Sequence, residues 1–245
     1  MLDNKWALAR FLQSHHLPVP RTWRVESEEQ LSGLDLPYPV IVKPVQLENR
    51  QGVKQIDSLT AAVAHLREPH PAHRLPLLFQ EYIPGTDVDL SILANHGEVV
   101  DWTIQQWVKP GTLRFIDDEA ILGLGRQLAA ACRFHGLAHF DLRRDDRDGS
   151  VKVLECNPRF WATLRESMWN GTNFVARGIQ LATGQLAPAQ QVNRQITYSF
   201  PSQTLATCLK GDFSGLRGLN TESWQGTWQA FSDPLTWLHK VRSQL

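Results

Sequence analysis

The sequence has little that would indicate a secreted, membrane-spanning or nucleic-acid-binding protein. Its 245 residues include only three cysteines, without CxxC spacing, which argues against a disulfide framework or a cysteine-based zinc site. No apolar run approaches the roughly 20 residues of a membrane span, and the charged N-terminal segment is unlike a signal peptide. Because 25 basic side chains balance 25 acidic ones, bulk charge favours neither nucleic acid nor a membrane as a partner. We therefore expect a cytoplasmic protein with reduced thiols.

The common catalytic signatures are also missing. The sequence contains no GxxxxGK[ST] phosphate loop, no GxGxxG, no HExxH and no GxSxG. Its nine histidines are scattered, and the pair His15-His16 has no third residue at ligand spacing. The pattern therefore gives no support to a P-loop enzyme, a dinucleotide-binding enzyme, a zinc protease or a serine hydrolase.

Enough apolar material is present for a folded core, since 42% of the residues are hydrophobic. Short β-branched runs alternate with segments of helical periodicity. The expected strands are residues 22–25, 38–44, 52–56, 77–82, 88–94, 98–108, 137–143 and 151–157. Helices are expected after Asp3, after Ser27, after Asp57 or Ser58, and over residues 121–136 and 172–183. This mixture predicts an α+β fold with largely antiparallel sheets.

A predicted hairpin in the second half of the chain carries the most informative polar residues. Period-two alternation places Val153, Glu155 and Asn157 on one face of its second strand. A turn in the charged segment would place Asp141 opposite Val153 and diagonal to Glu155, about 7–8 Å away. Carboxylate and amide oxygens are hard donors that suit Mg²⁺. The alternative is a solvated strand end with ordinary surface carboxylates.

Two cationic residues at strand ends could face a phosphate. Arg159 follows Asn157 by two residues, and its guanidinium could bind a phosphate through two hydrogen bonds. Lys43 closes an apolar strand before Pro44, where it could either extend out of a sheet edge or direct its charge into a cleft. The segment Gln80 to Gly85 reads as a strand end followed by a turn. Each feature alone is compatible with a structural role.

Four segments taken in order carry a resemblance to a known family: DNKWALARFLQSHHLPVP, YPVIVKP, FQEYIPGTDVDLS and AHFDLRRDDRDGSVKVLECNPRFW. Together they resemble the ATP-grasp superfamily of carboxylate–amine ligases, in particular its carbamoyl-phosphate-synthase-like and biotin-carboxylase-like branch. The resemblance covers about residues 3–184. It implies a two-lobed ATP-grasp fold with antiparallel sheets and the nucleotide cleft between the lobes. The implied parts are an N-terminal lobe at 1–84, a C-terminal lobe at 85–190, and a C-terminal extension packed on it at 191–245.

The resemblance also implies a role for each candidate residue. Those expected to bind ATP are Lys5 and Lys43 at the phosphates, Gln80, Glu81 and Ile83 at the adenine, largely through backbone groups, and Asp87 at the ribose. The expected ligands of one or two Mg²⁺ ions are Asp141, Glu155 and Asn157. The expected catalytic residues are Lys43 and Arg159, which would stabilise the transferring phosphoryl group or the acyl-phosphate. By the same resemblance, Lys109 and Arg114 lie near the position where related proteins carry a further cationic group.

The implied reaction joins two small molecules, a carboxylate and an amine. The carboxylate takes the γ-phosphate of ATP to form an acyl-phosphate, and the amine then displaces phosphate. Such an enzyme works by positioning and charge neutralisation, so the lack of a nucleophilic side chain is consistent with it. The alternatives are a nucleotide-binding module without ligase activity and a small-molecule phosphotransferase.

Two departures from the family pattern affect this expectation. The usual α/β domain before the first lysine is lacking, so a homodimer or a partner chain would supply the missing N-terminal surface, unless the form is naturally short. The loop over the phosphates, Gln46 to Gly52, has a single glycine and therefore fewer freely approaching backbone amides, although Arg50 could add charge. The aromatics of the tail, including Trp224, Phe231 and Trp237, would form core, a substrate wall or a dimer surface.

Overall fold

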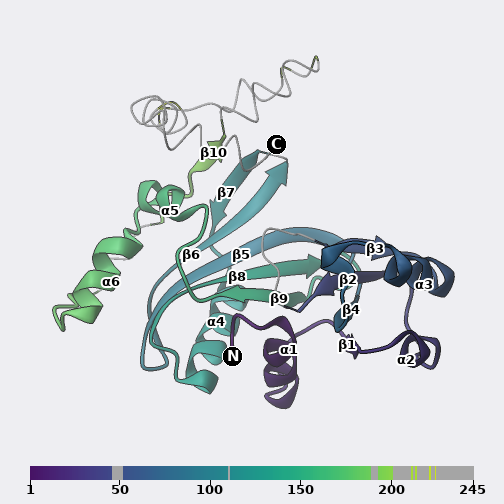
Figure 1. The fold of residues 1–245 in the computed structure, drawn as a ribbon. Coiled ribbons are helices and arrows are strands. Elements are labelled where there is room, and N and C mark those ends of the chain that lie inside the picture. The colour runs from purple at the N-terminus through teal and green to yellow at the C-terminus, as the bar shows by residue number, and fades with distance from the viewer. Residues whose placement is uncertain are drawn as a thin grey trace. The chain divides into compact units, whose positions relative to one another are not determined.

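The computed structural model of the chain (Figure 1) describes residues 1–45, 52–109, 111–188 and 193–200, together with residues 211, 213, 221 and 224. Most of the predicted phosphate-covering loop therefore lies outside the described residues, as do Phe231 and Trp237. Trp224 is described and has an exposed side chain.

The chain divides into two compact units. One unit consists of Met1–Val100 and Glu119–Trp161, and the other of Asp101–Asp118 and Ala162–Leu245. The domain boundaries expected at residues 84 and 190 stay predictions. Within the part of the chain that the structure describes, no helix is both long and apolar enough to span a bilayer.

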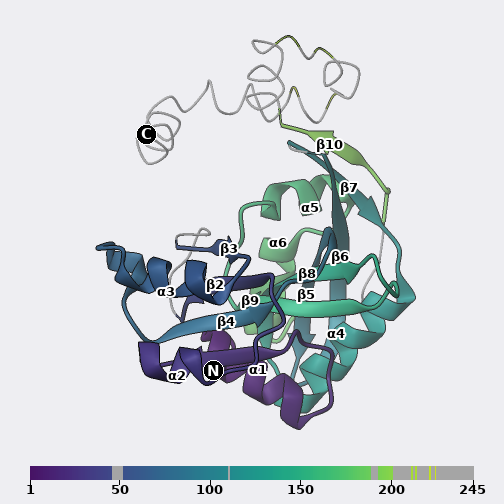
Figure 2. The same cartoon turned by 90° about the vertical axis from the view of Figure 1, so that its right-hand side faces the viewer.

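The first unit contains a four-stranded antiparallel sheet in the order β1-β4-β2-β3. Its strands are β1 (Thr22–Val25), β4 (Leu77–Glu81), β2 (Val40–Pro44) and β3 (Lys54–Ile56). Alternate residues of β2 and β4, such as Val40, Val42 and Phe79, are fully buried. Leu31 and Ala62 pack into the same core, so α2 (Glu28–Ser32) and α3 (Leu59–Arg67) cover one face of this sheet (Figure 2).

Side-chain caps determine where the helices of this unit begin. Ser27 and Ser58 cap α2 and α3 by accepting hydrogen bonds from backbone N–H groups three residues on, in agreement with the predicted starts. Helix α1 (Lys5–Ser14) is capped in the same way by Asn4, and the expectation of Asp3 as its cap is wrong. Because Asn4 is the cap, Lys5 is the first residue of the helix, and its side chain is buried.

The first unit also contains the antiparallel strands β5 (Gly85–Asn95), β8 (Gly136–Asp145) and β9 (Val151–Asn157). Helix α4 (Glu119–Cys132) packs against β5, and Gly125 allows this close approach, because a Cβ atom there would lie 2.5 Å from Leu90 Cδ2. Leu90 and Phe140 belong to the buried apolar face of these strands. The other face is polar and carries the site described below. The predicted α+β class with antiparallel sheets is confirmed.

The register between β8 and β9 differs from the one expected from sequence. Asp141 lies directly opposite Glu155, and Leu142 lies opposite Val153, so Leu154 is the extra residue of a β-bulge. A bulge shifts the alternation of side chains by one residue. Val153 and Cys156 are consequently both buried, although three positions separate them. The expectation that Val153 shares a face with Glu155 is therefore wrong.

Among its described residues, the second unit contains three strands and two helices. Its elements are β6 (Glu98–Lys109), which begins in the first unit, β7 (Thr112–Ile116), α5 (Leu164–Asn170), α6 (Phe174–Ala182) and β10 (Thr197–Ser199). β7 pairs antiparallel with both β6 and β10. A buried apolar cluster of this unit consists of Leu113, Phe115 and Tyr198. Lys109 and Arg114 belong to this unit, so their expected approach to a nucleotide stays a prediction.

Candidate functional site

The polar face of β5, β8 and β9 brings the predicted metal ligands together. Side chains that are neighbours across the strands form two rows, Asp89–Asp141–Glu155 and Ser91–His139–Asn157. The first row therefore places three carboxylates on adjacent strands, and the predicted amide ligand lies in the second row. Asp141, Glu155 and Asn157 come from two adjacent strands and offer side-chain oxygen atoms, which are the donors that Mg²⁺ prefers. The residues present thus fit the expected ion.

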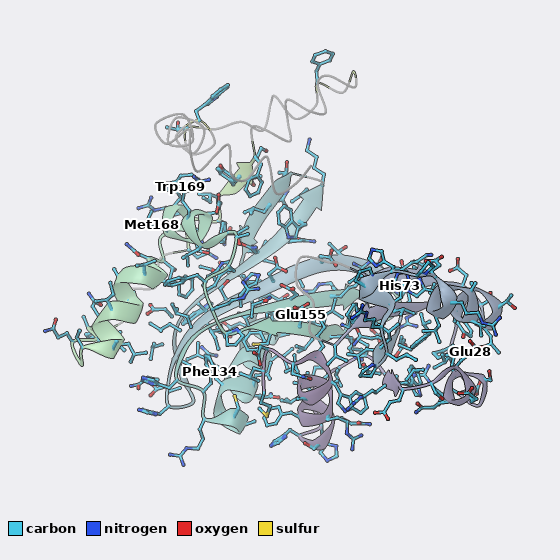
Figure 3. All side chains as sticks on the ribbon, in the orientation of Figure 1. Glu28, His73, Phe134, Glu155, Met168 and Trp169 are labelled. Carbon is cyan, nitrogen blue, oxygen red and sulfur yellow. The ribbon has the colours of Figure 1, made fainter. Side chains whose placement is uncertain are left out.

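Lys5 joins this row of carboxylates from helix α1. Its buried Nζ lies 3.0 Å from Glu155 Oε1 (Figure 3 labels Glu155). Burial of an ammonium group is tolerated when a hydrogen-bonded carboxylate accompanies it. A predicted phosphate-binding lysine and a predicted metal ligand, 150 residues apart in the sequence, therefore meet as an ion pair.

Lys43 reaches the same strand from the four-stranded sheet. Its Nζ donates hydrogen bonds to Gln80 Oε1 at 2.9 Å and to the backbone oxygen of Leu154 at 3.3 Å. The Gln80 amide is itself oriented, because its Nε2 donates to Thr22 Oγ1 at 2.9 Å. Burial lowers the pKa of Lys43 to about 8, and the nearby carboxylate of Glu155 offsets only part of this effect. Lys43 is thus a desolvated cation at the edge of the carboxylate row.

The hydrogen bonds of Gln80 bear on the expected adenine contacts. Gln80 is buried and uses its side chain to hold Lys43, and its neighbour Glu81 pairs with Arg147 at 3.2 Å and Arg21 at 3.5 Å. The Glu81 backbone N–H donates to the Arg21 carbonyl at 2.8 Å. The Glu81 N–H is therefore already engaged, and a nucleotide bound at this segment would have to contact other backbone groups.

Arg143 engages two groups that the sequence assigned to the nucleotide. Its Nε donates to the carbonyl oxygen of Ile83 at 2.6 Å, and its Nη1 forms an ion pair with Asp87 Oδ1. Asp87 and Arg143 are direct neighbours across β5 and β8. A ribose hydroxyl would have to share the Asp87 carboxylate with this guanidinium.

Arg159 lies at the exposed end of the second row. Its Nη2 donates to the side-chain oxygen of Asn157 at 3.2 Å, and its Nη1 donates to the carbonyl of Phe160 at 3.2 Å. The side chain of Arg159 is exposed. The predicted catalytic arginine and the predicted amide ligand are therefore in contact.

His139 and Asp89 belong to this face, and the sequence reasoning missed both. His139 Nδ1 lies 2.9 Å from Ser91 Oγ, its Nε2 lies 3.4 Å from Asp141 Oδ1, and its ring stacks on Trp161 at a centroid distance of 5.2 Å. Asp89 is buried beside them. Period-two alternation in β8 would have placed His139 on the same face as Asp141, so this signal was available.

Gly52 is the one described residue of the predicted phosphate-covering loop. It has a positive φ of 70°, and a Cβ atom there would lie 2.7 Å from Ala72 Cβ and 2.9 Å from Pro44 Cγ. Glycine tolerates this φ and has no Cβ atom, so the backbone can pass between the side chains of Ala72 and Pro44.

The fold is that of an α+β protein with antiparallel sheets, and its polar strand face gathers lysines and carboxylates. Comparison with known families then identifies the chain as a member of the ATP-grasp superfamily. A family model described as "ATP-grasp in the biosynthetic pathway with Ter operon" matches residues 73–204, which is more than half of the chain. A second model, described as an ATP-grasp domain, matches residues 2–114. The resemblance seen in the sequence is confirmed.

Individual relatives are distant and longer. The chain is 24% identical over 195 residues to the arginine-specific large chain of carbamoyl phosphate synthase of Bacillus subtilis (strain 168), covering 72% of this chain and 19% of that protein. It is 24% identical over 207 residues to D-aspartate ligase of Enterococcus faecium (strain Aus0004), covering 71% and 48%. The biotin carboxylase domain of 2-oxoglutarate carboxylase from Hydrogenobacter thermophilus, solved with MgADP and bicarbonate, shares the fold with a TM-score of 0.69 at 14% identity, covering 80% and 49%.

Proposed function

We propose that the chain is an ATP-dependent ligase that activates a substrate carboxylate as an acyl-phosphate for attack by an amine. The observation that supports it best is the meeting of Lys5 and Lys43 at β9, where Glu155 lies opposite Asp141. Two buried ammonium groups beside a row of carboxylates form a site for a polyphosphate and a divalent cation together. Membership of the ATP-grasp superfamily supports the same reaction class.

The proposed chemistry needs no nucleophilic side chain. A carboxylate oxygen of the substrate attacks the γ-phosphorus of ATP, and the bond to the ADP oxygen breaks. The amine nitrogen then attacks the acyl carbon, loses a proton and expels inorganic phosphate. Lys43 and Arg159 would stabilise negative charge on the transferring phosphoryl group.

Asp141, Glu155 and Asn157 would hold Mg²⁺ in this site, and the ion when bound neutralises charge on the phosphate oxygens. Lys5 would orient Glu155 before nucleotide binds and contact a phosphate afterwards. Lys43, held by Gln80, would keep its position in either state. In the adenine segment, Arg143 would fix the Ile83 carbonyl so that the neighbouring backbone stays extended.

We infer that the acid or the amine is an amino acid, because one relative is a D-aspartate ligase. The chain spans 48% of the length of that relative and 19% of the length of the carbamoyl phosphate synthase chain. The use of ATP together with the free thiols of Cys132 and Cys156 supports a cytoplasmic setting.

The decisive experiment measures ADP release from Mg-ATP with pooled amino acids, small acids and amines, then with single pairs. Release that requires both an acid and an amine, together with a product containing the new amide bond, supports the proposal. Glu155→Gln should lose this release, and Glu119→Gln, at an exposed carboxylate of α4, should keep it. Activity of Glu155→Gln equal to the wild type would contradict the assignment.

A nucleotide-binding module without ligase activity is the second candidate, and one observation favours it. The predicted phosphate-covering loop, Gln46 to Gly52, has a single glycine in its sequence, so fewer backbone amides could approach a transferring phosphate freely. ATP binding without ADP release across the whole pool would favour this module. ADP release with a stable phosphorylated acid, and no requirement for an amine, would favour a phosphotransferase.

A further inference from the structure

A second group of potential metal ligands lies outside the nucleotide site, where α3 leads into β4. His65 lies in the last turn of α3, Glu68 is the residue that ends the helix, and His73 closes the 3₁₀ turn η1 (Pro71–His73). The sequence reasoning treated these histidines as scattered. Folding brings them together because η1 lies against α3. Figure 3 shows His73 in this region, apart from Glu155.

The distances in this cluster match the coordination shell of a small transition-metal ion. Glu68 Oε2 lies 3.5 Å from Nδ1 of His65 and 3.5 Å from Nδ1 of His73. One ligand atom from each of the three residues lies within 4.8 Å of the others. Zinc bonds of about 2.0–2.1 Å at tetrahedral angles place ligand atoms about 3.4 Å apart. The two measured separations therefore need little adjustment around one ion.

The hydrogen-bonding state of the two imidazoles is unusual for buried groups. His65 is buried, and neither of its ring nitrogens has a hydrogen-bond partner; Nδ1 of His73 is buried and without a partner as well. The rings pack at a centroid distance of 3.8 Å. Buried polar atoms normally have a partner, because leaving them without one destabilises the fold. A metal ion would bind these nitrogens.

The ion pairs and exposure of Glu68 suit a metal ligand. Lys54 Nζ lies 3.5 Å from Glu68 Oε1, which leaves Oε2 directed at the two histidines. The Glu68 side chain is 49% exposed, so an ion can enter from solvent.

We infer that His65, Glu68 and His73 bind one Zn²⁺, which fastens the end of α3 to the segment leading into β4. Two imidazoles and a carboxylate suit zinc better than Mg²⁺, which prefers oxygen donors alone. Three protein ligands leave a fourth position for solvent. The group Asp89–His139–Asp141 also has metal-ligand chemistry, but it belongs to the site already described. The inference does not depend on the proposed ligase activity.

The test measures zinc binding by chelator-treated full-length protein, using titration with Zn²⁺ and metal analysis after gel filtration. Wild type should retain one zinc that Glu68→Gln and His73→Ala lose. Their zinc affinity should fall by more than about 100-fold, because loss of an outer partner alone costs about 10–100-fold. Glu68 is half exposed, so Glu68→Gln should still fold. Zinc should raise the melting temperature of wild type and leave that of Glu68→Gln unchanged.

Two control variants distinguish zinc binding at this cluster from the loss of an ion pair and from zinc binding at the nucleotide site. Lys54→Gln removes the same ion pair as Glu68→Gln but keeps all three ligands, so it should retain the zinc. His139→Ala should also retain it, because His139 lies in the nucleotide site. Equal zinc affinity in wild type, Glu68→Gln and His73→Ala would overturn the inference. Loss of the bound zinc only in His139→Ala would overturn it too.

Discussion

Replacing Lys43 with methionine would show whether the site holds a lysine whose charge destabilises the fold. Lys43 is only 6% exposed, and burial lowers its pKa from 10.5 to about 8. A change of this size corresponds to roughly 3 kcal/mol of unfavourable free energy for the charged form, at about 1.4 kcal/mol per pKa unit. Methionine has a similar shape without the charge, so Lys43→Met removes this unfavourable contribution.

Lost hydrogen bonds oppose the gain. Lys43 donates to Gln80 Oε1 and to the Leu154 carbonyl, and Gln80 is buried. Leaving a buried acceptor without its donor costs about 1–3 kcal/mol. Near neutral pH, Lys43→Met should therefore be between equal to wild type and about 2 kcal/mol more stable, the difference between these two contributions.

The pH dependence isolates the contribution of the charge. As pH rises above about 8, folded Lys43 loses its proton, whereas the unfolded chain keeps it until about 10.5. The unfolded state then binds more protons than the folded state, so the stability of wild type rises in this window relative to that of the variant. Between about pH 7 and about pH 9.5, the free energy of unfolding of wild type should therefore rise by about 2 kcal/mol relative to that of Lys43→Met.

Urea denaturation followed by tryptophan fluorescence provides the measurement, with metal chelated and nucleotide absent. Lys54→Met is the matched control, because it makes the same substitution at a lysine that is half exposed. Parallel stability profiles of wild type and Lys43→Met across this range would refute a depressed Lys43 pKa. The same variant should bind ATP more weakly, since the proposed phosphate contact is gone.

Three further substitutions test the site and the packing behind it. Glu155→Gln should lower Mg-ATP turnover by about 10²-fold or more while the far-ultraviolet circular dichroism stays that of wild type. Gly125→Ala should destabilise by about 1–3 kcal/mol, because its Cβ would lie 2.5 Å from Leu90 Cδ2. The control Gly123→Ala, with no atom within 4 Å, should stabilise α4 by about 0.5–1 kcal/mol. Arg143→Met should lower the free energy of unfolding by about 1–3 kcal/mol, through the loss of the Asp87 and Ile83 contacts. The exposed Arg126, which lies 3.7 Å from Glu119, should contribute less than about 1 kcal/mol.

The sequence predicted the fold class because most local patterns agreed with the final structure. The strands beginning at Thr22, Val40 and Leu77 are short segments rich in β-branched or apolar residues, and Ser27 and Ser58 stand where helices begin. The ATP-grasp resemblance rested on short segments around Lys43 and Glu155, and the comparisons confirm it.

The register of β9 could not be predicted because a bulge carries no strong sequence signal. Val153 and Leu154 are adjacent and both apolar, so period two can be started from either one. Only the burial of Val153 together with Cys156 shows that the extra residue is Leu154. The consequence for the site is favourable, because the bulge places Glu155 directly opposite Asp141 instead of diagonal to it.

The cluster of His65, Glu68 and His73 was missed for a different reason. Its spacing combines one helical step of three residues with a further step of five across a helix end and a 3₁₀ turn. Such spacing does not predict that the three side chains lie close together, because the direction of the chain after Glu68 depends on tertiary packing. The buried, partnerless nitrogens appear only once the fold is known.

The pairing of Lys5 with Glu155 implies that metal and nucleotide bind cooperatively. Lys5 is buried and lies 3.0 Å from Glu155 Oε1. If Glu155 ligates Mg²⁺, Lys5 needs another anion, and a phosphate oxygen of ATP can take this place. Mg²⁺ at Glu155 would then favour a phosphate at Lys5, and a phosphate at Lys5 would favour Mg²⁺ at Glu155, so we expect a coupling of about 1–3 kcal/mol between the two ligands. Calorimetric titrations should show that Mg²⁺ tightens ATP binding by about 5–150-fold in wild type and by clearly less in Lys5→Met. An identical Mg²⁺ effect in both proteins would show that Lys5 does not exchange partners.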